Sequence, residues 1–158
     1  MATSETSASP AVLELERFLP YRLSVLTNRI STAIARIYVR RFGLTVPEWR
    51  VMAVLGRFGA MSANATCERT AMDKVRVSRA VARLAASGRL DRRTDDADRR
   101  RTLLALTPQG QAVYAEIGPL ALAVEARLLA RLGAADRADL ARVLSKLEAA
   151  AATSFAEG

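Results

Sequence analysis

The sequence predicts a mainly α-helical protein that contains one small β-hairpin. Apolar residues recur at helical spacing along most of the chain, and capping residues and glycines separate these segments. Strand-like segments occur at residues 90–93 and 102–106, on either side of a charged loop. With 158 residues, 51% of them apolar, the chain is long enough to bury an ordinary core and corresponds to one domain.

The first helix is predicted over residues 13–42, where apolar side chains follow a helical period. Gly43 provides a natural C-terminal stop. Pro20 fits only near the start of this helix or at a kink, because proline has no backbone N–H to donate. Residues 1–12 are mostly small and polar, and we expect them to be disordered.

The second helix has a strong start signal. Thr45 and Glu48 stand at the spacing of a capping box, with Pro47 inside the first turn. The helix is predicted to run to about Phe58, and Gly59 closes it.

A third and a fourth helix follow, each with a capping residue. Ser62 precedes a short helix over residues 63–71, and Asp73 precedes a longer one that ends at Gly88. In the longer helix, the period points apolar side chains inward, namely Val77, Val81, Leu84 and Ala85. It points basic side chains outward, namely Lys74, Arg76, Arg79 and Arg83.

The loop of the predicted hairpin is densely charged. Residues 91–101 contain five arginines and four aspartates. Such a tip is too charged to be buried, and its arginines favour an anionic partner. We therefore interpret the hairpin as an arm that reaches an anionic surface.

Two helices are predicted after the hairpin. Thr107 and Pro108 form a start signal for a long helix to about Leu132, which Pro119 is expected to kink. Gly133 separates it from a last helix over residues 135–152. Their apolar faces are broad and find no cover elsewhere in the chain, so a partner helix from a second copy is expected to cover them. Residues 153–158 form a tail.

The net charge of +8 is concentrated in one part of the chain. Residues 69–101 contain eleven basic and five acidic side chains, a net of +6. Such a patch raises the local potential and favours a polyanion. Arginine supplies 22 of the 24 basic residues, and its planar fork suits phosphates and guanine edges.

Several classes of protein are excluded or disfavoured. The longest apolar runs are too short to span a bilayer, and the first ten residues lack the features of a signal peptide, so we expect a cytoplasmic protein with no membrane partner. Cys67 is the single cysteine and histidine is absent, so no internal disulfide, metal site or cofactor is expected. We also find no paired-carboxylate pattern, glycine-rich phosphate loop or activated nucleophile, and we expect no enzyme.

A capped basic helix followed by a basic hairpin is the arrangement of a winged helix-turn-helix DNA reader. Over residues 13–150 the chain closely resembles the MarR family of transcriptional regulators. Three segments carry the resemblance, namely GLTVPEWRVMAVL, MDKVRVSRAVARLAASGRL and DADRRRTLLALTPQG. In the last segment, Asp98, Arg100, Leu106, Thr107 and Gly110 match the signature of the family's wing.

The resemblance implies a fold and an assembly. A domain over residues 13–152 would contain a winged helix-turn-helix at 45–107, flanked by dimerisation helices at 13–42 and 108–152. Two such chains would form a two-fold dimer that places two recognition helices in successive major grooves of a pseudo-palindromic operator in double-stranded DNA.

The predicted DNA-contacting residues lie on the third helix cap, the fourth helix and the wing. They are Ser62, Asp73, Lys74, Val75, Arg76, Ser78, Arg79, Arg83, Asp98, Arg99, Arg100 and Arg101. By resemblance, Arg100 enters the minor groove, and Asp98 braces it or a neighbouring arginine. Arg99 and Arg101 are expected at phosphates. A solvated helix face is the alternative for Arg76 and Arg79, and plain helix filler is the alternative for Ser78.

The resemblance also implies control by a small molecule, since many relatives bind an aromatic acid between the dimerisation helices and the winged domain. The candidate ligand-binding residues are Tyr21, Arg22, Asn28, Tyr38, Trp49 and Met52. An arginine can hold a carboxylate while aromatic rings cover the apolar part of the ligand. An ordinary core is the alternative for Tyr38, Trp49 and Met52.

The resulting hypothesis is a dimeric repressor that a small aromatic carboxylate or phenolic compound releases from its operator. Two alternatives remain open: a redox-responsive regulator acting through Cys67, and a non-specific architectural DNA-binding protein. Cys67 lies on the predicted third helix, whereas the sensing thiols of relatives lie near the start of the first helix. A buried structural role is therefore favoured for Cys67.

Overall fold

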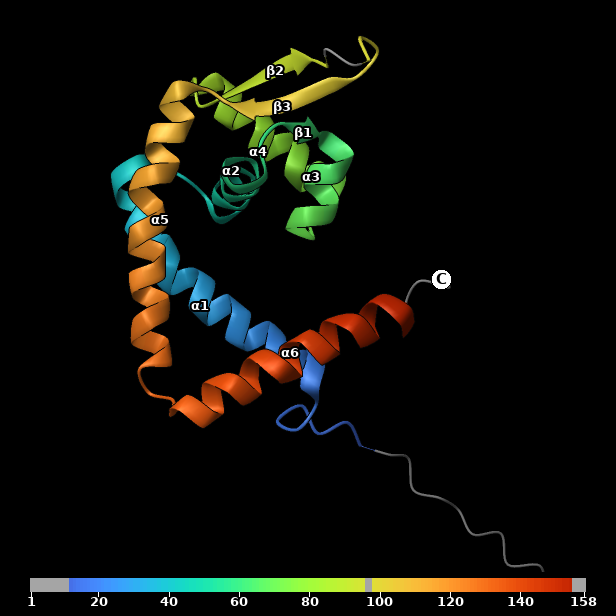
Figure 1. Cartoon of the computed structure of the whole chain (residues 1–158), viewed down its shortest axis with the longest axis vertical. Coiled ribbons are helices and arrows are strands. Elements are labelled where there is room, and N and C mark those ends of the chain that lie inside the picture. The colour runs from blue at the N-terminus through green and yellow to red at the C-terminus, as the bar shows by residue number, and fades with distance from the viewer. Residues whose placement is uncertain (1–11, 96–97, 155–158) are drawn as a thin grey trace, which may run out of the picture.

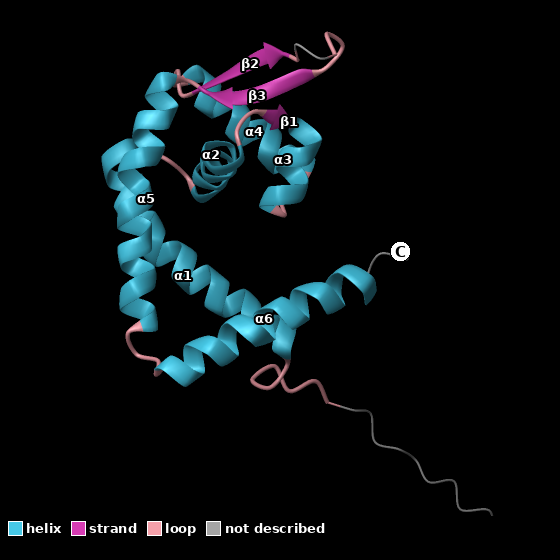
Figure 2. Cartoon of the chain, viewed as in Figure 1, coloured by secondary structure: helices cyan, strands magenta, loops and turns pink. Residues whose placement is uncertain are grey.

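A computed structural model describes residues 12–95 and 98–154 of the chain. Within these residues the predicted order of four helices, a hairpin and two helices is confirmed (Figure 2). The elements are α1 (Leu19–Phe42), α2 (Val46–Phe58), β1 (Met61–Ser62), α3 (Ala63–Thr70), α4 (Lys74–Ala86), β2 (Leu90–Thr94), β3 (Thr102–Leu106), α5 (Pro108–Leu129) and α6 (Ala134–Ser154). The fold class, mainly α-helical with a small β wing, is therefore confirmed.

The predicted helix caps are present. The Thr45 hydroxyl and the Glu48 carboxylate close a reciprocal capping box at the start of α2. Ser62, Asp73 and Thr107 each accept a hydrogen bond from a backbone N–H in the first turn of the helix that follows. Local sequence signals thus set the starts of four helices, because each cap satisfies a backbone donor that the helix leaves unpaired.

The predicted start of the first helix was wrong. The helix begins at Leu19 rather than at Leu13, and a turn precedes it at residues 15–17. Pro20 explains the difference, because its ring cannot donate a backbone hydrogen bond and would clash with the carbonyl of residue 16 in a continuous helix. Apolar periodicity upstream of a proline does not extend the helix.

The sheet has three antiparallel strands in the order β1–β3–β2. In the hairpin, Leu90 pairs with Leu106 and Thr94 pairs with Thr102. Strand β1, which pairs with β3, was missed by the sequence analysis because a two-residue strand carries no readable alternation.

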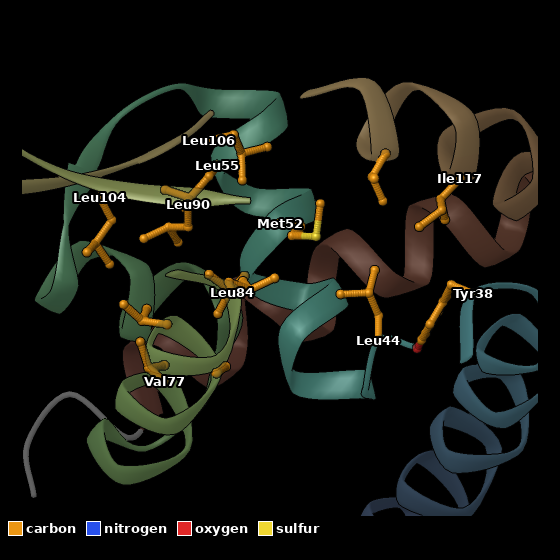
Figure 3. Packing of buried hydrophobic residues seen from close by; sticks show 14 of the residues in the cluster. Tyr38, Leu44, Met52, Leu55, Val77, Leu84, Leu90, Leu104, Leu106 and Ile117 are labelled. Atoms are coloured by element: carbon orange, nitrogen blue, oxygen red, sulfur yellow. The ribbon is translucent and has the colours of Figure 1, made fainter. Parts of the chain in front are cut away.

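The core lies between α2, α4, the sheet and the starts of α1 and α5's neighbours in space, and Figure 3 shows its side chains. Val77, Val81 and Leu84 point into it as predicted. Ala85 was expected there but is exposed, and Ala80 is buried instead. The inward face of α4 is centred nearer Ala80, because packing against α2 decides which residues at the edge of the helical stripe are covered.

The long terminal helices extend away from this core. Figure 1 shows α5 running from the wing to the opposite end of the molecule, where α6 begins. Pro119 lies inside α5, as predicted. No described residue of α6 is buried, so this helix has an apolar side that its own chain leaves open.

Candidate nucleic-acid interface

Helix α4 exposes a basic face and buries the opposite one. Its N-cap, Asp73, accepts a hydrogen bond from the Arg76 backbone N–H at 2.8 Å, and its carboxylate lies 3.4 Å from Arg76 Nε. Val75, at the start of the helix, is 58% exposed, and an exposed aliphatic side chain here suits a thymine methyl group. The other exposed residues that the sequence analysis selected on α4 are Lys74, Ser78, Arg79 and Arg83.

Arg83 does not lie free on this face. Its Nε lies 2.9 Å from Oε1 of Glu48, whose side chain is only 5% exposed. The remainder of the Arg83 side chain stays open, with an exposed fraction of 64%. This ion pair joins the start of α2 to the last turn of α4, and the sequence analysis did not foresee it.

The wing tip is organised around Asp98. Its Oδ1 accepts a hydrogen bond from the Arg100 backbone N–H at 3.1 Å, and its Oδ2 lies 3.7 Å from Arg101 Nε. The Arg101 backbone N–H also donates to the Asp98 carbonyl at 2.8 Å. The side chains of Arg99 and Arg100 are exposed. Asp98 therefore braces the neighbouring Arg101 and orders the backbone of Arg100.

The recognition helix and the wing border a common cleft of about 310 Å³. Lys74 and Ser78 line it from α4, and Arg92 lines it from β2. Its apolar floor contains Val77, Val81 and Leu104. Figure 1 shows α4 and the hairpin at the same end of the molecule, so their basic residues form one continuous surface.

Ser62 is engaged in the local structure beside this surface. Its hydroxyl accepts a hydrogen bond from the Ala65 backbone N–H at 3.2 Å, and its carbonyl accepts one from the Thr66 hydroxyl at 2.9 Å. The side chain is half-buried. Its visible role is that of a cap for α3.

An aromatic cluster lies on the other side of α2. The ring of Trp49 lies 5.7 Å from that of Tyr38 on α1 and 6.1 Å from that of Tyr114 on α5. Burial raises the pKa of Tyr38 to about 12, although the positive charge of Arg50 lowers it. Tyr38 therefore stays neutral throughout the physiological range.

The six candidate ligand-binding residues do not share one pocket within the single chain. Tyr21 and Arg22 line a surface groove of about 430 Å³ on α1, and Asn28 lines a neighbouring one. Trp49 lines a separate groove of about 430 Å³ between α2 and α5, together with Tyr114. Tyr38 and Met52 belong to the buried core.

Comparisons with known proteins agree with this geometry. A family model described as the MarR family matches residues 42–101. A MarR family transcriptional regulator from Silicibacter pomeroyi DSS-3 is 30% identical; the match covers 88% of this chain and 98% of that one, with a TM-score of 0.75. The chain belongs to the MarR family. A search of curated proteins finds no match.

Two further MarR-like structures concern regulators with small ligands. One, BpsR of Bordetella bronchiseptica, concerns regulation of DNA binding by 6-hydroxynicotinic acid; it is 26% identical, covers 87% of this chain and 98% of its own, and has a TM-score of 0.74. The other, the PcaV transcriptional regulator of Streptomyces coelicolor in complex with its natural ligand, is 25% identical, covers 89% and 99%, and has a TM-score of 0.72.

MarR-family proteins are transcriptional regulators rather than enzymes. In the described parts of the chain, no group of three or more His, Cys, Asp or Glu side chains is arranged to hold a metal ion. No helix there is long and apolar enough to cross a membrane. Cys67 is half-buried, packs against the core, and lines the cleft between α4 and the wing.

Two residues of this MarR-family chain escaped the sequence analysis. Tyr114 stacks on Trp49, and Glu48 has a second role beyond the capping box. A signal for Tyr114 was present in Gly56, a glycine inside a predicted helix, which often marks close packing. A β-carbon at Gly56 would lie 2.7 Å from ring atoms of Tyr114. No local signal linked Glu48 to Arg83.

Proposed function

We propose that this MarR-family chain is a sequence-specific DNA-binding regulator that acts as a two-fold dimer. The observation that carries this proposal is the surface shared by α4 and the wing, which exposes arginines from both elements. The net charge of +6 over residues 69–101 favours the phosphate backbone. The exposed start of α4 is suited to base edges in the major groove, because recognition helices contact bases through their N-terminal residues.

The dimer is inferred from the uncovered apolar side chains of the long helices. On α6 these follow helical spacing at Leu140, Val143, Leu144 and Leu147, each 36–42% exposed. Further exposed apolar side chains on the other two long helices are Leu19, Tyr21, Leu23, Leu26, Leu120, Leu122 and Leu128. A second copy that contributes the same helices would cover these surfaces and set the spacing between two recognition helices.

Each candidate contact has a proposed role. Arg76 and Arg79 enter the major groove with Val75, and Lys74, Ser78 and Arg83 border it. Arg100 enters the minor groove, where a narrow groove attracts a guanidinium. Arg99 and Arg101 bind phosphates. Asp73, Asp98 and Ser62 act through the local structure that they stabilise.

We also propose that the regulator is a repressor and that a small aromatic carboxylate or phenol releases it from its operator. Support comes from the two ligand-regulated relatives and from the surface grooves on α1. Arg22 supplies a cation at one groove, and Tyr21 supplies an aromatic ring there. A second copy lying across α1 would close these open grooves and bring their residues near the partner's aromatic cluster.

The DNA proposal is tested by selecting duplexes from a random-sequence pool with the full-length protein. Binding of a selected duplex is then measured by fluorescence anisotropy in competition with random DNA at fixed salt. Sequence-specific binding requires a clear preference for the selected duplex, whereas an architectural protein binds both duplexes equally. The variants Arg76→Ala and Arg79→Ala separate the roles further, since a lost phosphate contact lowers the salt slope by roughly 0.9 and a lost base contact relaxes sequence preference.

The ligand proposal is tested with a panel of benzoates, hydroxycinnamates and pyridine carboxylates. A true effector raises the melting temperature and weakens binding of the selected duplex, and the DNA weakens effector binding by the same factor. Arg22→Ala and Trp49→Ala should blunt this response more than they change DNA binding. If no compound binds at millimolar concentration, and peroxide weakens DNA binding only when Cys67 is present, the redox alternative replaces the ligand proposal.

A further inference from the structure

Both oxygens of the buried Glu48 carboxylate are engaged. Oε2 accepts hydrogen bonds from the Thr45 backbone N–H and from the Thr45 hydroxyl, each at 2.6 Å. Oε1 lies 2.9 Å from Arg83 Nε on the recognition helix. A capping box needs only the first set of contacts. The second contact ties the start of α2 to α4.

The ion pair controls where the Arg83 guanidinium lies. Only Nε faces Glu48, and the side chain is 64% exposed, so most of the guanidinium remains open to a further partner. Arg76 precedes Arg83 by seven residues, which is two helical turns less about 20°, so both arginines share one flank of α4. Their flank is not the one that carries Lys74 and Ser78 along the cleft.

We propose that Glu48 is a positioning residue for DNA recognition. It holds α4 at a defined angle to α2 and presents the outer edge of Arg83 to the DNA backbone. Arginine is suited to this double role, because its fork can bind a carboxylate on one edge and a phosphate on another. This inference rests on the proposed DNA-binding function and adds a residue of α2 to it.

The proposal predicts an effect opposite in sign to that of simple electrostatics. Removing a negative charge from a DNA-binding domain strengthens its attraction to the phosphates. Glu48→Gln removes that charge with little change of shape, yet positioning predicts weaker binding because Arg83 loses its partner. Glu48→Asp keeps the charge and an acceptor for the helix start, but it shortens the side chain by one carbon–carbon bond of about 1.5 Å. It therefore loses its reach to Arg83.

The experiment measures the dissociation constants of the full-length protein for a duplex selected from a random pool and for a random duplex. We expect Glu48→Gln and Glu48→Asp each to weaken binding of the selected duplex about five- to tenfold. In an Arg83→Ala background, each should change the constant less than about twofold, because a residue that acts through Arg83 has nothing left to position. A merely structural role of Glu48 would produce the same loss in both backgrounds.

Glu116 supplies the matched control, because its carboxylate also pairs with an arginine of another helix, Arg41. Glu116→Gln and Glu116→Asp should bind the selected duplex as the wild type does. Should Glu48→Gln fail to melt cooperatively, the charge-conserving Glu48→Asp still decides the question. Wild-type affinity for Glu48→Asp, or equal losses with and without Arg83, overturns the proposal. A wild-type protein without preference for the selected duplex would instead overturn the proposed function.

Discussion

Gly110 on α5 lies against the carbonyl oxygen of Arg89, so closely that a β-carbon at position 110 would be 2.0 Å from that oxygen. The neighbouring Thr107 hydroxyl accepts a hydrogen bond from the Gly110 N–H at 3.1 Å and donates one to the Gly88 carbonyl at 2.6 Å. The start of α5 is therefore bonded directly to the end of the recognition helix. This contact explains why a glycine follows the wing at this position.

Gly110→Ala is expected to destabilise the protein. Because the β-carbon would meet backbone rather than a flexible side chain, the start of α5 must shift, at a cost of about 2 to 3 kcal/mol. For a chain of this length the melting temperature should fall by roughly 4 to 12 °C in a calorimetric scan. Gly118→Ala is the control, since nothing lies within 4 Å of a β-carbon there. That variant should be about 0.5 to 1 kcal/mol more stable than the wild type, and equal melting of the two variants would contradict the assignment.

Arg100→Ala is expected to weaken binding of a selected operator duplex by about 1 to 3 kcal/mol without loss of stability. The Arg100 side chain is exposed at the wing tip, so its removal leaves no cavity. Fluorescence anisotropy measures the affinity, and thermal melting checks the fold. Arg142→Ala removes an equally charged side chain from α6, where Arg142 pairs with Asp139, and should leave DNA affinity unchanged. Unaltered affinity for Arg100→Ala would show that the wing tip does not contact DNA.

Leu144→Glu is expected to break the dimer. Leu144 belongs to the exposed apolar stripe of α6, and a carboxylate buried against a partner helix has no compensating charge. Sedimentation should detect the wild type at twice the chain mass of 17.1 kDa and the variant near the single mass at micromolar concentration. Ala149→Glu introduces the same charge about 140° further round the helix, outside the stripe, and should remain dimeric. A monomeric wild type would remove the basis for a two-fold operator.

The stability of the protein should fall between pH 10 and about 12 through the titration of Tyr38. The folded pKa is raised from 10.0 to about 12 by burial, so the folded state holds the phenolic proton more tightly than the unfolded chain does. The stabilisation is complete below pH 10 and is lost as the pH rises through the folded pKa. Urea unfolding across this range measures the effect. Tyr38→Phe should lose this part of the dependence, and identical pH profiles for the two proteins would refute it.

Local signals located most helix boundaries correctly. Thr45, Asp73 and Thr107 were identified as caps from their own neighbourhoods, because a helix end is settled by nearby donors and acceptors. The start of α1 was misplaced because apolar spacing continues upstream of Pro20 although the backbone cannot remain helical there. Strand β1 was missed because two residues paired with β3 exist as a strand only through that distant partner.

The candidate site divides in the same way. The basic patch, the capped recognition helix and the brace by Asp98 depend on residues close together in the chain, and they were predicted from it. The pairing of Arg83 with Glu48, the stacking of Tyr114 on Trp49 and the contact of Gly110 with Arg89 join separate segments. No spacing rule encodes such contacts.

The sequence by itself therefore determined where the helices start, where the charge gathers and which family the chain resembles, because these properties depend on short-range backbone bonding and composition. The tertiary structure alone decided which arginine is held by a buried carboxylate and which aromatic rings meet. It also decided that the six candidate ligand residues fall into separate grooves within one chain. Long-range contacts follow from how the helices pack in three dimensions, and that packing is a property of the whole chain.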